Sequence, residues 1–125
     1  MKTARPVNLS LSTVMTQPLP AIASITHRIT GIVLFAGVGF LLYVLDLSLS
    51  SPQGLDDARA LLATSMSKFV LLVVLATLAY HFVAGIRHLL LDFDIGDSLA
   101  AARLSAQVTF AVSALLVVLA GLWLW

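Results

Sequence analysis

The sequence predicts an all-α integral membrane protein with three transmembrane helices. The chain of 125 residues is 60% hydrophobic and only 10% charged, whereas a water-soluble domain has roughly a quarter charged residues. Its apolar residues also gather in three long stretches, each of which can cross a bilayer as a helix. We therefore expect a single membrane domain over residues 1–125 and no separate soluble domain.

The first apolar stretch runs from Ile29 to Leu49 and predicts a transmembrane helix over residues 22–49. Pro20 suits the first turn of this helix, because the missing N–H of proline needs no partner there. Residues 1–20 lack a continuous apolar core and contain three prolines. They predict a short interfacial segment and not a cleavable signal peptide.

The second and third apolar stretches predict spans over residues 66–91 and 104–125. Residues 50–54 include proline and glycine, which predicts that the first helix ends there. Apolar residues then recur at helical spacing, which predicts a short interfacial helix before Lys68; they are Leu55, Ala58, Leu61 and Leu62. Residues 92–97 form the next connection, with Gly96 as its turn residue.

The distribution of basic residues predicts the orientation. One side of the membrane receives five of them, Lys2, Arg5, Arg28, Arg87 and Arg103, and the other side receives Arg59 and Lys68. The positive-inside rule then places the N-terminus in the cytoplasm. We expect a multi-pass protein of the bacterial inner membrane with a periplasmic C-terminus, where Trp123 and Trp125 join the outer aromatic belt.

Composition also limits the possible functions. A net charge of +1 argues against a nucleic-acid partner, which calls for a dense basic surface. The chain has no cysteine, so disulfides, thiol catalysis and iron–sulfur ligation by cysteine are excluded. Any metal must be held by histidine or carboxylate.

His81 is the most informative residue, because it lies in an apolar run of 18 residues from Phe69 to Ile86. A charged side chain at such a position costs roughly 2.5 kcal/mol or more, so an ionisable residue needs a partner or a function. His81, Gly85, His88 and Asp92 share one helical stripe. A histidine, a small residue and a cationic rim suit a flat metal cofactor such as haem. Alternatively, His81 hydrogen-bonds a neighbouring helix.

A second cluster opens the first span. The spacing of Ser24, His27 and Arg28 predicts that all three lie on one helix face near the membrane surface. A hydroxyl, an imidazole and a guanidinium there could bind a carbonyl ligand or pair with carboxylates. The alternative is that Ser24 caps locally, while His27 and Arg28 anchor the helix at the interface.

With these residues in place, the chain resembles the cytochrome b membrane anchor of succinate dehydrogenase (respiratory complex II), the anchor designated C. Residues 5–9, Arg-Pro-Val-Asn-Leu, carry part of the match. Residues 24–31, Ser-Ile-Thr-His-Arg-Ile-Thr-Gly, are similar to the family signature S-I-x-H-R-x-(S/T)-G. Residues 81–89, His-Phe-Val-Ala-Gly-Ile-Arg-His-Leu, are similar to H-x-x-x-G-(I/x)-R-H-(L/M) and are followed by Asp92.

The resemblance implies that the three spans form half of a helical bundle, completed by a second membrane anchor, designated D. It implies one haem b shared by the two anchors, with His81 as an axial ligand of the iron and with His27, Arg28 and His88 near the haem propionates. It further implies a ubiquinone pocket lined by Ser24 and Arg28, with Ile25 nearby. A flavoprotein subunit and an iron–sulfur subunit would dock on the cytoplasmic side. The chain alone would not oxidise succinate.

The sequence is also compatible with other functions. A fumarate reductase anchor has the same architecture and runs the reaction toward quinol oxidation. Two alternatives belong to other classes of protein: a purely structural membrane anchor without haem, and a small transporter. A proton relay would usually need further acids within the spans, and Asp46, near the opposite surface, is the only candidate.

Overall fold

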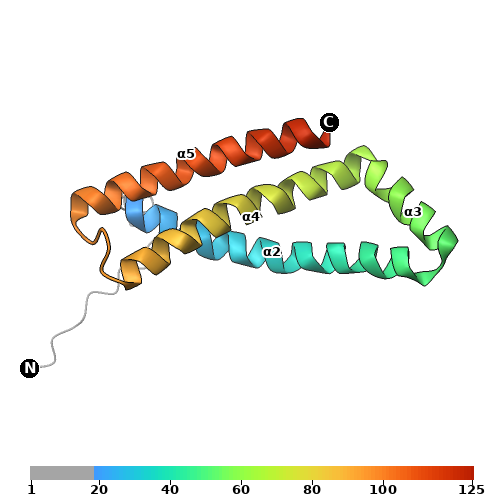
Figure 1. Ribbon diagram of the computed structural model, residues 1–125, viewed down its shortest axis with the longest axis horizontal. Helices are drawn as coiled ribbons and strands as arrows, with labels where there is room; N and C mark the ends of the chain where they lie inside the picture. Colours follow the sequence, from blue (N-terminus) through green and yellow to red (C-terminus); the bar gives the residue numbers. More distant parts are fainter. Residues whose placement is uncertain (1–18) are drawn as a thin grey trace, which may run out of the picture.

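The computed structural model describes residues 19–125, and every structural statement below refers to this range. It contains four helices in the order α2 (Leu19–Ser50), α3 (Pro52–Ala63), α4 (Ser65–Asp92) and α5 (Leu99–Leu124), and no strand within the described range (Figure 1). The expected all-α class is confirmed. The segment expected over residues 1–20 lies outside the described residues, except for Leu19 and Pro20, which belong to the first turn of α2.

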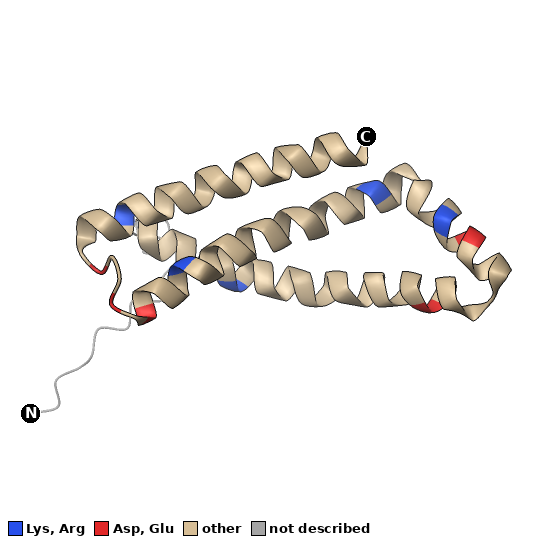
Figure 2. Cartoon of the chain, in the orientation of Figure 1, with Lys and Arg blue, Asp and Glu red and all other residues tan. Residues whose placement is uncertain are grey.

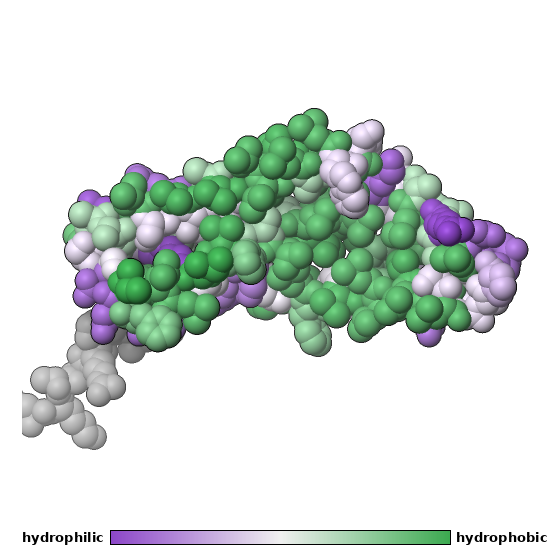
Figure 3. Space-filling view, in the orientation of Figure 1, coloured by the Kyte–Doolittle hydropathy of each residue, from purple (hydrophilic) through white to green (hydrophobic). Residues whose placement is uncertain are grey.

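Three of these helices, α2, α4 and α5, are long and apolar enough to cross a membrane. They correspond to the three expected spans, although α5 begins at Leu99, five residues before its expected start at 104. Figure 3 shows apolar residues over the middle of the molecule and hydrophilic residues gathered toward its two ends. This distribution is typical of a multi-pass membrane protein.

The short helix α3 connects α2 to α4 at one end of the molecule, across the gap between their ends (Figure 1). Its start is fixed by Ser51, whose hydroxyl accepts a hydrogen bond of 2.9 Å from the N–H of Gly54, and by Pro52 as its first residue. Thr64 ends α3 and caps α4, where its hydroxyl accepts from the N–H of Ser67. The short helix expected before Lys68 is confirmed.

The opposite end of the molecule carries the loop between α4 and α5. Asp94 (φ 57°) and Gly96 (φ 78°) adopt the left-handed conformation that reverses the chain. Gly96 is therefore the turn residue, as expected. Ser98 then caps α5, because its hydroxyl accepts a hydrogen bond from the N–H of Ala101.

Small residues bring the three long helices together. Ala23 of α2, Ala84 of α4 and Ala106 of α5 are almost completely buried. A Cβ added to Gly37 of α2 would lie 2.8 Å from Val74 of α4, so only glycine permits this approach. Large apolar side chains point outward instead, and Phe35 is 86% exposed. Outward apolar surface of this extent requires lipid or a neighbouring protein to cover it.

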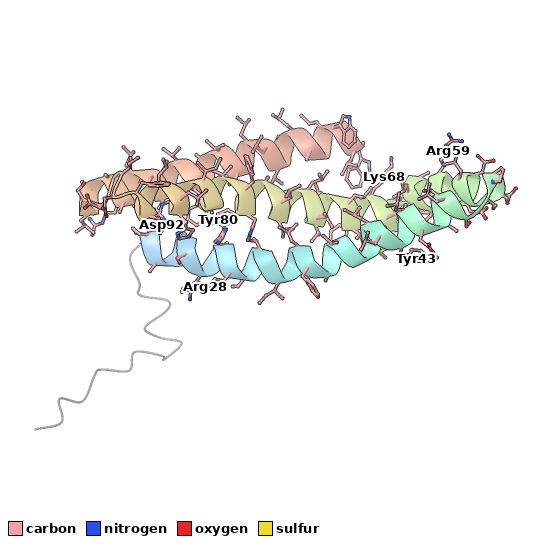
Figure 4. The ribbon with its side chains drawn as sticks, turned by 60° about the horizontal axis from the view of Figure 1, so that its bottom comes forward. Arg28, Tyr43, Arg59, Lys68, Tyr80 and Asp92 are labelled. Carbon is pink, nitrogen blue, oxygen red and sulfur yellow. The ribbon has the colours of Figure 1, made fainter. Side chains whose placement is uncertain are left out.

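Charged residues lie near the two ends of the bundle, as Figure 2 shows. Arg28 in the first third of α2, Arg87 near the end of α4 and Arg103 near the start of α5 belong to the end that carries the α4–α5 loop. Arg59 in α3 and Lys68 in the first turn of α4 lie toward the other end (Figure 4). The described residues thus keep the expected direction of the charge bias, three against two. Lys2 and Arg5, which enlarge this bias in the sequence, lie outside the described residues.

Candidate functional site

The two sequence clusters meet where α2 and α4 approach each other near the loop end of the bundle (Figure 1). Tyr80 fixes this contact: its hydroxyl donates a buried hydrogen bond of 2.8 Å to the carbonyl oxygen of Ala23 in α2. Its ring also packs against Phe110 of α5, with ring centroids 5.3 Å apart. A single side chain of α4 therefore ties all three long helices together, directly before His81 (Figure 4).

The imidazole of His81 is held at its Nδ1 atom. This nitrogen lies 3.0 Å from the carbonyl oxygen of His27 and 3.2 Å from the hydroxyl of Thr30, both in α2. The Nε2 atom makes no hydrogen bond with any described residue. A histidine whose Nδ1–H is bound to oxygen presents Nε2 as the free electron pair, which is the usual arrangement of a metal-ligating histidine.

Two glycines make room around these rings. A Cβ on Gly31 would lie 3.1 Å from Cε1 of His81, so glycine at this position lets the imidazole reach α2. A Cβ on Gly85 would meet only Nε2 of His27, at an ordinary 3.6 Å. The α2–α4 contact therefore does not require glycine at position 85. A side chain there would instead fill part of the open space beside the histidines, which Gly85 lines.

All three histidines of the chain gather at this space. The rings of His27 and His81 stack with centroids 3.9 Å apart and an angle of 13°, and His27 lies 5.0 Å from His88. They line an open groove of about 470 Å³, whose remaining walls are Phe82, Gly85, Ile86 and Leu89. The predicted stripe of His81, Gly85 and His88 is thus one wall of a largely apolar groove with imidazoles along it.

The cluster expected on one face of α2 is divided in the structure. His27 turns toward α4 and is part of the groove, whereas Arg28 is exposed and extends away from α4 (Figure 4). Ser24 and Ile25 are half-buried. Because Ser24 lies inside α2, five residues after Leu19, it does not cap this helix. Ser24 and Arg28 are one helical turn apart, so they share one side of α2.

Arg87 has a position that the sequence did not predict. It is only 6% exposed and faces α5, where its Nε donates to the hydroxyl of Ser105 at 2.9 Å and a terminal nitrogen donates to the carbonyl oxygen of Ala102. It lines a cavity between α4 and α5 and is not among the residues of the histidine groove. We therefore assign Arg87 to the α4–α5 contact.

The histidines do not form a complete metal site on their own. Among the described residues, no group of three or more histidine, aspartate or glutamate side chains is placed to hold a metal ion. The rings of His27 and His81 are stacked nearly parallel, so they do not face each other across a common space that one metal ion could fill. Among the three rings, that of His81 is the one whose Nδ1 is held by two oxygens of α2.

Sequence reasoning assigned no role to Thr30 and Tyr80: Thr30 contacts Nδ1 of His81, and Tyr80 joins α4 to α2 directly before His81. Both are buried, at 8% and 7% exposure, and both make hydrogen bonds between α2 and α4. A signal for Thr30 was present, because it stands at the (S/T) position of the signature over residues 24–31 and is a polar residue within an apolar span.

These features define a class: a multi-pass membrane protein that gathers its three histidines at one helix contact and exposes broad apolar faces. The model of the succinate dehydrogenase/fumarate reductase transmembrane subunit family matches residues 1–120. The chain belongs to this family, and the expected family is confirmed.

Individual relatives agree with the family. The chain is 37% identical to the succinate dehydrogenase cytochrome b556 subunit of Coxiella burnetii, over the full length of both chains. It is 35% identical to the protein of the same name from Paracoccus denitrificans, over 82% of this chain and 78% of the relative. A mitochondrial succinate dehydrogenase cytochrome b560 subunit from Dictyostelium discoideum is 37% identical, over 79% of this chain and 52% of the relative.

Proposed function

We propose that this chain is the subunit of succinate dehydrogenase that binds haem b and ubiquinone and anchors the enzyme in the membrane. In this function, His81 is an axial ligand of the haem iron, and Ser24, Ile25 and Arg28 form part of the ubiquinone pocket. The single observation that carries the proposal is the state of His81: its Nδ1 is bound to two oxygens of α2, while the ring lines an open, mostly apolar groove.

The residues of the groove fit a haem. Gly85 leaves space beside the rings, and apolar walls such as Phe82 and Leu89 suit a macrocycle. At the polar end of the spans, His88 and His27 would supply donors for carboxylate groups. Arg28, the residue after His27, would add a cation at the same end of the bundle, outside the groove itself. Bound there, the haem would supply one-electron redox chemistry, while this chain's residues ligate and orient it.

A second ligand would come from outside this chain, because the rings of His27 and His81 are stacked 3.9 Å apart and do not face each other across the groove. We assign it to the second membrane anchor, D, which would complete the helical bundle. The exposed apolar side chains in the walls of the groove support this assignment, since Phe82 is 64% exposed and Leu89 is 59% exposed. The lipid bilayer would cover the remaining apolar surface.

The quinone would bind beside the first turns of α2. A quinone oxygen gains negative charge on reduction, and a hydroxyl with a nearby guanidinium stabilises such charge in a low-dielectric site. Ser24 and Arg28 offer these two groups one helical turn apart, close to the loop end of the bundle. At this boundary between membrane and water, the two protons that quinone reduction requires would come from water.

The flavoprotein and iron–sulfur subunits would dock at the same end. The charge bias of the described residues supports a cytoplasmic position for this end, with the N-terminus inside and the C-terminus in the periplasm of a bacterial inner membrane. Electrons from succinate would then reach ubiquinone from the cytoplasmic side. In this function, succinate would be oxidised by the partner subunits and not by this chain.

A fumarate reductase anchor is the second candidate, because the matching family model covers both enzymes. The geometry of the groove is equally suitable for either direction of electron flow. A transporter is disfavoured, because Asp46, the sole acid inside an expected span, is exposed near the α3 end of α2, far along the helix from His81.

The test is purification of the complete complex from cells that produce this chain with its partner subunits. We expect a b-type α-band after reduction with dithionite and succinate-driven reduction of ubiquinone. An assembled complex without a b-type band contradicts the haem assignment. A complex that reduces an artificial dye with succinate, but not ubiquinone, contradicts the quinone assignment.

A further inference from the structure

Three polar groups form a closed triangle at the contact of α2 with α4. The hydroxyl of Thr30 donates to the carbonyl oxygen of His27 at 2.8 Å, within α2. The Nδ1 atom of His81 lies 3.0 Å from that carbonyl oxygen and 3.2 Å from the hydroxyl oxygen of Thr30. Thr30 is 8% exposed, so water does not readily replace these contacts.

For a neutral imidazole, only one distribution of protons satisfies the whole triangle. A carbonyl oxygen can only accept, so Nδ1 must carry the proton to bond with His27. Thr30 uses its own proton toward the same carbonyl and then has a lone pair free to accept from Nδ1–H. If Nδ1 were unprotonated, its lone pair would face the carbonyl oxygen of His27 at 3.0 Å, which is repulsive. The triangle therefore leaves the lone pair of the imidazole on Nε2.

We propose that Thr30 is a positioning residue for His81: its hydroxyl holds the imidazole in the Nδ1–H tautomer and, as a second acceptor for that proton, tunes the reduction potential of the haem. This inference rests on the proposed ligation of haem iron by His81. Acceptors at the outer nitrogen of a ligating histidine make the ligand more basic, which favours the ferric form of the iron.

The surroundings of the ring favour a positioning role. Gly31, adjacent to Thr30, lets His81 come within reach of the hydroxyl, because a Cβ there would lie 3.1 Å from Cε1. The ring of His27 covers one face of the imidazole at 3.9 Å. The triangle restrains one edge of the ring and the stack restrains one face, so ring rotation is opposed from two directions.

The test compares Thr30→Val with Thr30→Ser in the complete complex. Valine keeps the shape of threonine and removes the hydroxyl, whereas serine keeps the hydroxyl. We expect Thr30→Val to shift the haem midpoint potential in the positive direction, by about 60 mV for a tenfold change in the relative affinity for the two iron states. Thr30→Ser should stay near the wild-type potential and low-spin spectrum.

Thr77→Val is the matched control. Thr77 lies one turn before His81 on α4, and its hydroxyl bonds only to the carbonyl oxygens of Val73 and Val74 in its own helix. This variant removes a hydroxyl from the same span without touching the triangle. We expect its haem potential to be unchanged.

Each outcome distinguishes a role of Thr30 in positioning the His81 ring from a merely structural role in packing α2 against α4. An unchanged potential and spectrum in Thr30→Val, with only lower thermal stability, would overturn the proposal. Loss of haem from Thr30→Val alone supports it, whereas equal loss from Thr30→Val, Thr30→Ser and Thr77→Val overturns it. The proposed function fails separately, if the wild-type complex lacks a b-type band or if replacement of His81 leaves the low-spin spectrum intact.

Discussion

The imidazole rings of His27 and His81 lie parallel, 3.9 Å apart, although 54 residues separate them in the sequence. The same pair is joined by a hydrogen bond from Nδ1 of His81 to the backbone of His27. The two signature segments of the chain therefore form one structural unit: α2 supplies the acceptors that orient the ring, and α4 supplies the ring. Helix α2 therefore takes part in both proposed functions: it orients His81 for haem, and it carries Ser24 and Arg28 for quinone.

Gly31→Ala should disturb the proposed ligand directly. The added methyl group would lie 3.1 Å from Cε1 of His81, so the ring must move. We expect an altered low-spin spectrum and about tenfold weaker haem retention. Because alanine favours helix by about 1 kcal/mol over glycine, a weaker helix cannot explain such a loss.

Gly39→Ala is the control for this substitution, because nothing lies within 4 Å of a Cβ built at Gly39. Its spectrum and haem content should match those of the wild type. If both alanine variants lose haem equally, close contact at Gly31 is not the cause.

Tyr80→Phe should weaken the contact of α4 with α2 while keeping the aromatic contact with Phe110. The variant loses the 2.8 Å hydrogen bond to Ala23. Interhelical hydrogen bonds in membranes contribute about 0.6 kcal/mol on average and at most about 1.7 kcal/mol. We expect a small decrease in the melting temperature of the complex, followed through haem absorbance. Tyr43→Phe, at a site that is 59% exposed, should have no such effect.

Ser24→Ala tests the quinone assignment with little change in volume. Removing one preorganised donor to a developing negative charge costs about 10²-fold or more in turnover. We expect succinate-driven quinone reduction, normalised to flavin content, to fall while reduction of an artificial dye persists. Normal quinone rates in this variant would exclude Ser24 from the pocket, and equal losses in both assays would indicate an assembly defect.

Arg28→Leu should likewise impair quinone reduction, and it should also alter the haem spectrum if the guanidinium serves a propionate. Arg103→Leu is the matched control, since Arg103 is an exposed arginine at the same end of the bundle. Equal loss of quinone activity in the two variants would mean that general positive charge, and not the position of Arg28, matters.

Orientation can be tested with reporter fusions after Trp125. The predicted periplasmic C-terminus should activate only a reporter that works in the periplasm. Activity of a cytoplasmic reporter at this position would reverse the orientation and the proposed docking side together.

Hydropathy and turn-forming residues made the three spans, the short helix α3 and the turn at Gly96 predictable. The rotation of each helix about its axis was not, because α2 and α4 are apolar on nearly all sides and hydropathy does not mark the face that becomes buried. On α2 the buried face is a stripe of small and medium-sized residues, Ala23, Thr30, Gly37 and Val44. Packing of small residues sets that rotation instead. Thus the sequence placed His27 and Arg28 on one face, whereas the structure turns His27 into the groove and leaves Arg28 exposed.

Residue identities made the candidate site recognisable, but not its internal contacts. His81 was predictable as a rare ionisable residue within an apolar span. The oxygens that bind its Nδ1 come from a helix more than 50 residues away, so their register depends on how Gly31 and Gly37 let the helices approach. The burial of Arg87 against α5 depends in the same way on the α4–α5 contact.

The most direct test of axial ligation is the visible spectrum of the complex carrying His81→Leu. Leucine suits a membrane span and preserves the helix, but it provides no ligand to iron. We predict that the low-spin b-type spectrum is lost or becomes high-spin, while succinate oxidation by the soluble subunits, measured with an artificial dye, is largely retained. An unchanged low-spin b-type spectrum in this variant would contradict axial ligation by His81.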